Sequence, residues 1–127
     1  MIIMHHLRKS RALFMTAFLE ELGVDYELRF YDRNEMRRAP PELREVHPLG
    51  KSPVIEDNGM TIAESGAIIT YLIDTYDTER KFAPASNAGA EYVRYLQWLH
   101  YAEGSAASPL LINMLTRRED PKPPIVT

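Results

Sequence analysis

The stretch that decides the fold is His47-Pro48-Leu49-Gly50-Lys51-Ser52-Pro53-Val54-Ile55-Glu56-Asp57-Asn58-Gly59. Its prolines exclude a continuous helix, because an interior proline lacks a backbone donor and clashes with the preceding turn. Residues 54–56 are predicted to form a short strand, and the Asn-Gly pair after them is typical of a hairpin turn. Residues 60–62 are then the returning strand, so this part of the chain is predicted to be an antiparallel hairpin.

Two amphipathic helices are predicted around this hairpin. Residues 65–76 have apolar side chains at helical spacing, and the face expected to be buried consists of Ile68, Ile69, Leu72, Ile73 and Tyr76. Residues 11–22 form an earlier helix, with Ser10 as the expected N-cap and Gly23 as the expected stop. Its apolar stripe is expected to combine two adjacent lines, one through Leu13 and Ala17 and one through Phe14, Phe18 and Leu22.

The order of the predicted elements defines an α/β fold. Strands and helices alternate as βαβαββα, over residues 1–5, 11–22, 26–31, 40–46, 54–56, 60–62 and 65–76. A parallel strand–helix–strand unit followed by an antiparallel hairpin gives a mixed four-stranded sheet.

The remaining residues are predicted to be helical. Residues 79–86 are expected to be a linker. A new helix follows, with Ser86 or Asn87 as its cap, and continues to about Arg118, with Gly104 and Pro109 as weak points. One or two helices cannot build a core of their own. Residues 87–127 are therefore expected to be the incomplete beginning of an all-α domain after a first domain over residues 1–78.

Composition limits the possible functions. The 127 residues carry a net charge of -3 and 45% hydrophobic residues, which is typical of a soluble globular protein and argues against a dedicated nucleic-acid binder. There is no cysteine, so any thiol chemistry needs a thiol from a ligand. The first residues lack the apolar run of a signal peptide or membrane span, and a cytoplasmic location with no membrane partner is expected. No metal site is expected, because the histidines lack acidic or cysteine companions at ligand spacing.

The deciding stretch, followed by Ala63-Glu64-Ser65-Gly66-Ala67-Ile68-Ile69-Thr70-Tyr71-Leu72, resembles the glutathione-site segment of the glutathione S-transferase superfamily. Ser10-Arg11, leading to Leu19-Glu20-Glu21-Leu22-Gly23, resembles the first helix of that family and the loop before it. The resemblance covers residues 1–76, and more loosely the helix after Asn87. It implies a thioredoxin-like N-terminal domain followed by an all-α domain, usually in a homodimer. Family members run to about two hundred residues, so this chain is expected to lack part of the helical domain.

The resemblance also implies how glutathione, the expected co-substrate, would be bound. Pro53 matches the family's cis-proline, and the backbone of Ser52 would pair with the cysteinyl unit as an added strand. Ser65 would bind the γ-glutamyl carboxylate at a helix N-terminus, and Glu64 would accept from the ammonium group. Lys51 matches a position that often binds the glycyl carboxylate. Each residue also has a purely structural interpretation, such as an N-cap or a solvated lysine.

Ser10 is the predicted catalytic residue. In serine-type members of the family, a hydroxyl in this loop donates a hydrogen bond to the glutathione sulfur and favours the thiolate. Alternatively, Ser10 only caps the helix and Arg8, Lys9 or Arg11 polarises the thiol. The arginine that often follows the family serine by four residues is Phe14 here.

The resemblance therefore implies a glutathione transferase that attacks a small electrophile and contributes to detoxification. The alternatives are a glutathione-binding or scaffold protein without turnover, or a glutathione-dependent peroxidase, isomerase or dehalogenase.

Overall fold

The computed structural model describes residues 1–117. The chain divides into two compact units, Met1–Phe82 and a second that begins at Ala83, and each is described by itself. The boundary expected at residue 78 and the linker over residues 79–86 stay predictions.

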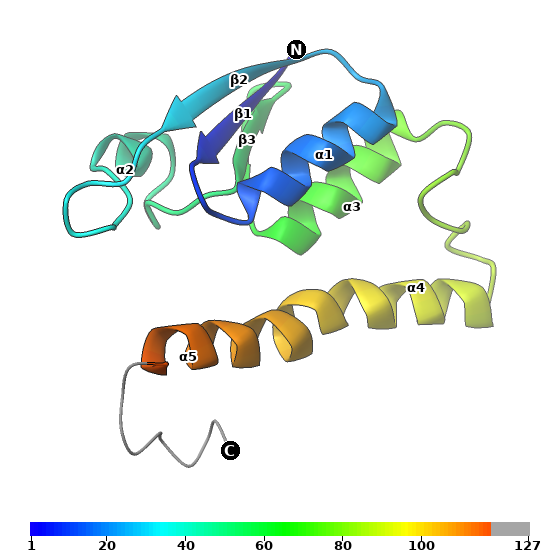
Figure 1. Cartoon of the computed structure of the whole chain (residues 1–127). Helices are drawn as coiled ribbons and strands as arrows, with labels where there is room; N and C mark the ends of the chain where they lie inside the picture. Colours follow the sequence, from blue (N-terminus) through cyan, green and yellow to red (C-terminus); the bar gives the residue numbers. More distant parts are fainter. Residues whose placement is uncertain (118–127) are drawn as a thin grey trace. The chain divides into compact units, whose positions relative to one another are not determined.

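The first unit is built on a mixed four-stranded sheet (Figure 1). Its strands are β1 (Ile2–Leu7), β2 (Tyr26–Tyr31), β3 (Val54–Asp57) and β4 (Met60–Ala63), in the order β2-β1-β3-β4. β1 pairs with β2 in parallel, whereas β3 is antiparallel to both β1 and β4. The predicted α/β class and strand pairing are confirmed. β1 continues two residues beyond the predicted end.

The strand register brings four chain segments to one end of the sheet. Leu7 at the end of β1 is level with Tyr31 at the end of β2. Val54 at the start of β3 pairs with His5, and Ala63 at the end of β4 pairs with Val54. We call this the Leu7 end of the sheet. The loops after β1 and β2, the loop before β3 and the start of the helix after β4 all leave the sheet there.

Two helices cover one face of the sheet, α1 (Ala12–Leu22) and α3 (Ser65–Tyr76), and α2 (Glu42–Val46) lies on the other side (Figure 1). The core between sheet and helices consists of Ile2, Met4, Ala12, Met15, Leu19, Ile55, Ile68 and Leu72. The predicted helix over residues 65–76 and its buried face are confirmed. For α1 the predicted stripe is wrong at Leu13 and Phe14, which are 62% and 68% exposed, whereas Phe18 and Leu22 pack against the core.

Residues with positive φ form the turn that ends α1 and the turn between β3 and β4. Gly23 ends α1 at φ 66°, where its N–H donates to Leu19 and Glu20. Asn58 and Gly59, at φ 48° and 75°, form the predicted hairpin turn between β3 and β4. Both positions require the left-handed region, which glycine and asparagine adopt at least cost.

The second unit is one helical rod of three parts. α4 (Ala90–Tyr101) leads into the π-helical segment η1 (Ala102–Ala107), and α5 (Ser108–Thr116) follows. The helix begins later than predicted, and Gly104 lies inside the π-helical segment rather than at a break. Pro109 lies in the first turn of α5, where its missing N–H is not needed. The predicted end near Arg118 lies outside the described residues. No described residue of this rod is buried.

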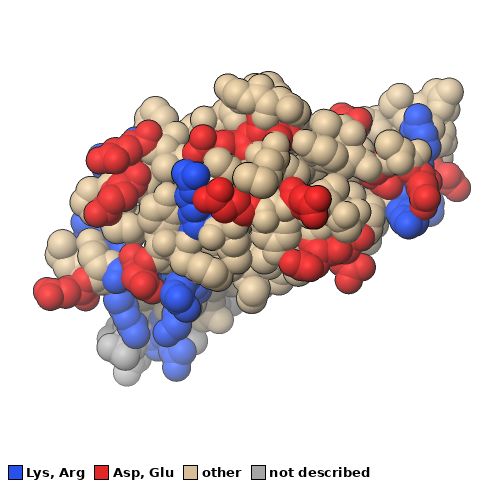
Figure 2. Space-filling model, turned by 90° about the horizontal axis from the view of Figure 1, so that it is seen from above, with Lys and Arg blue, Asp and Glu red and all other residues tan. Residues whose placement is uncertain are grey.

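The face drawn in Figure 2 carries acidic and basic side chains next to each other, with no large area of a single sign. Exposed ion pairs in the described part of the chain include Arg8 with Asp32 and Lys81 with Glu79. Within residues 1–117, no helix combines the length and the apolar character needed to cross a membrane.

Candidate functional site

Ser52 and Pro53 form the centre of the Leu7 end. Their peptide bond is cis, as the resemblance implied. The Ser52 hydroxyl donates to the carbonyl of His5 at 2.7 Å and accepts from the N–H of Leu7 at 3.1 Å. The side chain therefore fastens this loop to β1. The backbone N–H and C=O of Ser52 have no hydrogen-bond partner among the described residues, so both are available to an extended ligand.

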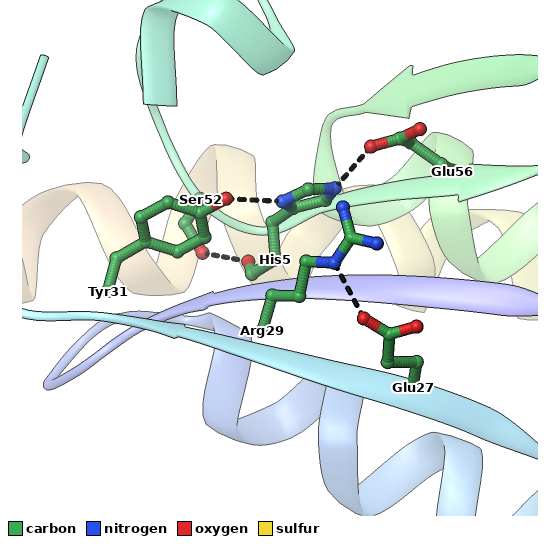
Figure 3. A network of polar contacts seen from close by, with 6 residues as sticks. All are labelled: His5, Glu27, Arg29, Tyr31, Ser52 and Glu56. Atoms are coloured by element: carbon green, nitrogen blue, oxygen red, sulfur yellow. Dashed lines mark hydrogen bonds and ion pairs between the residues drawn. The ribbon is translucent and has the colours of Figure 1, made fainter. Parts of the chain in front are cut away.

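A polar network lies beneath this loop on the α2 side of the sheet (Figure 3). The buried His5 ring places Nε2 2.7 Å from the Glu56 carboxylate and Nδ1 2.8 Å from the Tyr31 hydroxyl. A carboxylate only accepts, so Nε2 carries the proton that is donated to Glu56. In the neutral ring, Nδ1 accepts from Tyr31. The network fixes β1, β2 and β3 at the point where the Ser52 hydroxyl contacts the His5 carbonyl.

Ser10 lies in the loop after β1, just before α1. The residue at the N-cap position is Arg11, one residue later than predicted. The Ser10 hydroxyl oxygen still accepts the N–H of Ala12 at 3.1 Å, so it satisfies one donor of the first turn. A hydroxyl can accept and donate at once. Within the described residues the Ser10 hydroxyl donates to no acceptor, and its hydrogen remains available.

Glu64 and Ser65 form the junction between β4 and α3. Glu64 has φ 73° and ψ 123°, a conformation that residues with a Cβ rarely adopt. Its side chain is exposed and makes no cap hydrogen bond. Ser65 is 9% exposed, and its hydroxyl has no hydrogen-bond partner in the described part of the chain. The first N–H groups of α3 also lack partners within the helix. Together these groups are donors of the kind that bind anions at helix N-termini, and none of them is used by the described residues.

Lys51 is exposed and follows a tight turn in which the Gly50 N–H donates to the His47 carbonyl at 2.8 Å. Gly50 has φ 57°, and a Cβ there would lie 2.6 Å from Cγ of Arg44. Both the backbone conformation and the space beside Arg44 therefore favour glycine at this position. The Lys51 ammonium group makes no ion pair within residues 1–117.

His6 lies on the helix-covered face of β1 and contacts the Thr16 hydroxyl through Nδ1 at 3.0 Å. Burial lowers the pKa of His6, and the nearby positive charge of Arg8 lowers it further. The ring is therefore neutral at neutral pH. It adds no positive charge to the loop that carries Ser10.

The predicted site residues Ser10, Lys51, Ser52, Pro53, Glu64 and Ser65 all lie at the Leu7 end of the sheet. Within residues 1–117, no three His, Asp or Glu side chains are grouped so as to hold a metal ion. The contact of His5 with Glu56 was not predicted from the sequence, because β1–β3 pairing brings together residues 51 positions apart. The role of Arg33 was not predicted either, because its contacts with the Ser10 loop are to backbone carbonyls.

Comparison with known proteins supports one family. Residues 1–74 match the family model described as glutathione S-transferase, N-terminal domain. Glutathione S-transferase 3 of Schizosaccharomyces pombe is 43% identical over 105 residues, which are 83% of this chain and 42% of that protein. Glutathione S-transferase 1 of Saccharomyces cerevisiae is 36% identical over 120 residues, 90% of this chain and 50% of the relative. The chain thus spans about half the length of these curated relatives.

The solved structures that resemble this chain support the same family. A glutathione S-transferase from Actinobacillus pleuropneumoniae superposes with a TM-score of 0.82 at 42% identity, over 94% of this chain and 55% of that one. A glutathione transferase homolog from Lodderomyces elongisporus, with two glutathione molecules per subunit, superposes with a TM-score of 0.81 at 27% identity. That alignment covers 98% of this chain and 61% of the homolog.

Proposed function

The chain belongs to the glutathione S-transferase family, and on this premise we propose that it binds glutathione at the Leu7 end of the sheet and transfers the thiolate to an electrophilic small molecule. Glutathione has two carboxylates, one ammonium group and one thiol. A site for it needs backbone pairing, anion-binding donors and one carboxylate.

The observation that carries the proposal is the set of unused hydrogen-bonding groups at this end. The hydroxyl of Ser52 is fully engaged with β1, whereas its backbone N–H and C=O are open to the cysteinyl unit. The Ser65 hydroxyl and the start of α3 are open to the γ-glutamyl carboxylate. Glu64 is exposed beside them and can accept from the ammonium group. Lys51 supplies a positive charge for the glycyl carboxylate.

Ser10 is the proposed catalytic residue. Its oxygen is held by the N–H of Ala12, and its hydrogen can be donated to the glutathione sulfur. A free thiol has a pKa of about 8.5, so it is mostly protonated at neutral pH. A hydroxyl donor close to a helix N-terminus stabilises the thiolate. The thiolate then forms a bond to the electrophilic carbon, and in a substitution the leaving group departs with the bonding electron pair.

Two further properties belong to the same proposal. We expect the protein to form a homodimer, which size-exclusion chromatography with light scattering would detect. We also expect a cytoplasmic location. The electrophile is proposed only as a class, because the chain covers about half the length of its curated relatives.

Conjugation of a chloronitroarene tests the proposal, with Ser10→Ala as the decisive variant. If Ser10 lowers the thiol pKa by about two units, its loss reduces the thiolate fraction about a hundredfold well below the pKa. The more basic thiolate is about tenfold more nucleophilic, so the observed rate should fall about tenfold. Ser86→Ala is the matched control, because Ser86 is exposed and makes no hydrogen bond to the described residues.

The outcomes separate the competing functions. Conjugation that falls in Ser10→Ala but not in Ser86→Ala supports the transferase. Glutathione binding without conjugation in the unmodified protein supports a binding or scaffold protein instead. An unchanged rate in Ser10→Ala shows that another group activates the thiol.

A further inference from the structure

Arg33 connects the loop after β2 to the loop that carries Ser10. Its guanidinium group donates to three backbone carbonyls: Nε to Arg8 at 3.2 Å, Nη2 to Lys9 at 2.9 Å, and Nη1 to Arg37 at 2.9 Å. Two of these acceptors immediately precede Ser10 in the chain. The third belongs to the turn that follows Arg33 itself.

Two of the accepting residues have unusual backbone conformations. Lys9 has φ 57° and Arg37 has φ 59°, both in the left-handed region, which is unfavourable for a residue with a Cβ. Such conformations persist only where neighbouring groups impose them. One guanidinium group binds the carbonyls of both residues. Lys9 is adjacent to Ser10, so the hydrogen bond from Arg33 to the Lys9 carbonyl holds the backbone directly before the proposed catalytic residue.

Arg33 is itself held on a closed turn. Within residues 34–38, the Asn34 N–H donates to the Arg38 carbonyl at 2.9 Å and the Arg37 N–H donates to the Asn34 carbonyl at 2.8 Å. The Asn34 side-chain oxygen accepts the Arg38 N–H at 2.9 Å. These hydrogen bonds within the turn hold the backbone that follows Arg33 in one conformation.

The loop before Ser10 has additional ties to β2. The Arg8 N–H donates to the Tyr31 carbonyl at 2.9 Å. The Arg8 side chain pairs with Asp32 at 2.9 Å and lies over the Phe30 ring at 5.0 Å. These contacts end at Arg8. Beyond it, the Lys9 carbonyl is held by Arg33.

We propose that Arg33 is a positioning residue, which fixes the loop so that the Ser10 hydroxyl is aimed at the glutathione sulfur. The inference rests on the proposed function. A hydrogen bond weakens steeply as it becomes misaligned, so a small shift of the loop reduces thiolate stabilisation. Arginine is needed because its planar fork reaches several acceptors at once. A lysine has a single nitrogen and cannot reproduce the set.

The test is a pH titration of protein-bound glutathione, followed by the ultraviolet absorbance of the thiolate. The proteins compared are the unmodified chain, Ser10→Ala, Arg33→Ala, Arg33→Lys and Arg38→Ala. Arg33→Ala is expected to raise the pKa of the bound thiol by about one unit, which is about tenfold less thiolate at a pH below it. Arg33→Lys should give an intermediate value. Arg38→Ala removes the same charge from the same loop but none of the three bonds, and should leave the thiol pKa unchanged.

A second measurement reports on the loop without glutathione. Hydrogen–deuterium exchange over residues 8–13 should be faster in Arg33→Ala than in Arg38→Ala, because only the first variant releases the Lys9 carbonyl. Melting temperatures confirm that each variant is folded. If Arg33→Ala does not remain folded, the comparison of Arg33→Lys with Arg38→Ala decides the question.

The outcomes distinguish this inference from the proposed function. If Ser10→Ala raises the thiol pKa and Arg33→Ala does not, Arg33 has no positioning role. Equal shifts in Arg33→Ala and Arg38→Ala would show an effect of charge alone and overturn the inference. If the unmodified protein binds no glutathione, or Ser10→Ala leaves the thiol pKa unchanged, the proposed function fails. The exchange experiment then still shows whether Arg33 holds the loop.

Discussion

At the scale of single residues, Glu64 links stability to binding. Its backbone is held at φ 73° and ψ 123° between β4 and α3, and its side chain makes no cap hydrogen bond. Strain of this kind is stored at functional sites, where it aims particular groups at a ligand. The conformation presents the exposed carboxylate beside Ser65. We therefore expect Glu64 to be retained for binding at a cost in stability.

Replacing Glu64 with glycine should separate the effect of this residue on stability from its effect on glutathione binding. Glu64→Gly is expected to raise the free energy of unfolding by up to about 1 kcal/mol, because glycine relieves the strain but loses more entropy on folding. Glu64→Ala retains the strain and should leave stability nearly unchanged. Both variants should bind glutathione more weakly. Urea denaturation and calorimetric titration provide the measurements, and a Glu64→Gly variant with unchanged affinity would contradict the account.

The sequence predicts some of the site residues but not Arg33, which binds the loop that carries Ser10. The family resemblance implied a cis bond at Pro53, and the structure confirms it. The common ligand that the same motif implied for Ser52, Glu64 and Ser65 stays a prediction. The N-cap assignment of Ser10 was off by one position, although its hydroxyl still binds the first helical turn. Arg33 could not be found, because its acceptors are backbone carbonyls brought close by loop conformation. Side-chain patterns do not encode such contacts.

At the scale of elements, Asp57 ties the hairpin to α3. The buried carboxylate lies at the end of β3, and its Oδ2 accepts hydrogen bonds from Tyr71 at 2.8 Å and from Tyr76. Asn58 of the turn donates to the same oxygen at 3.2 Å. The hydrogen bond to Asp57, together with burial, raises the pKa of Tyr76 to about 12. These hydrogen bonds connect the middle and the C-terminal end of α3 to the turn between β3 and β4.

The raised pKa predicts how stability changes in alkaline solution. Below pH 10 Tyr76 is protonated in the folded and unfolded chain, and its contribution to stability is fully present. Above pH 10 the unfolded chain loses this proton first, so stability falls until the folded pKa near 12 is reached. Tyr76→Phe should make this fall shallower, and should lower stability at pH 8 by about 2 kcal/mol.

Denaturation at a series of pH values checks this expectation. Tyr101→Phe is the matched control, because the Tyr101 side chain is exposed and its hydroxyl makes no hydrogen bond to the described residues. An equal pH dependence in Tyr76→Phe and the unmodified protein would show that the Asp57 connection does not control the titration.

Helix faces show why some elements could be predicted and others could not. α3 carries its apolar residues on one side, so its bounds and buried face follow from the sequence. α1 has apolar residues all around, and only packing against the sheet selects Met15 and Leu19 and leaves Phe14 exposed. The π-helical segment η1 was not predicted, because no local pattern distinguishes its wider turn from an α-helix.

At the scale of the whole molecule, the two units differ in what they bury. The first unit has a core of its own, whereas the described helices of the second bury no residue. Large apolar side chains there are exposed, including Trp98 at 62% and Leu110 at 70%. An isolated helix gains little from apolar burial and is marginal in water.

This difference predicts how fragments behave. Residues 1–82 alone should unfold cooperatively, because their core is internal to the fragment. Residues 83–127 alone should show weak helical signal and no cooperative transition. Circular dichroism during thermal and urea denaturation measures both. A cooperative transition in the second fragment, at a concentration where it is monomeric, would contradict the expectation.

The central claim is that the open groups of Ser52 and Ser65 at the Leu7 end bind glutathione. Calorimetric titration of the protein with glutathione tests it most directly, with Ser65→Ala as the variant and Ser86→Ala as the control. We expect saturable binding that Ser86→Ala preserves and that Ser65→Ala weakens by at least about tenfold, the effect of losing one hydrogen bond to a charged group. No binding by the unmodified protein, or equal affinity in Ser65→Ala, would contradict it.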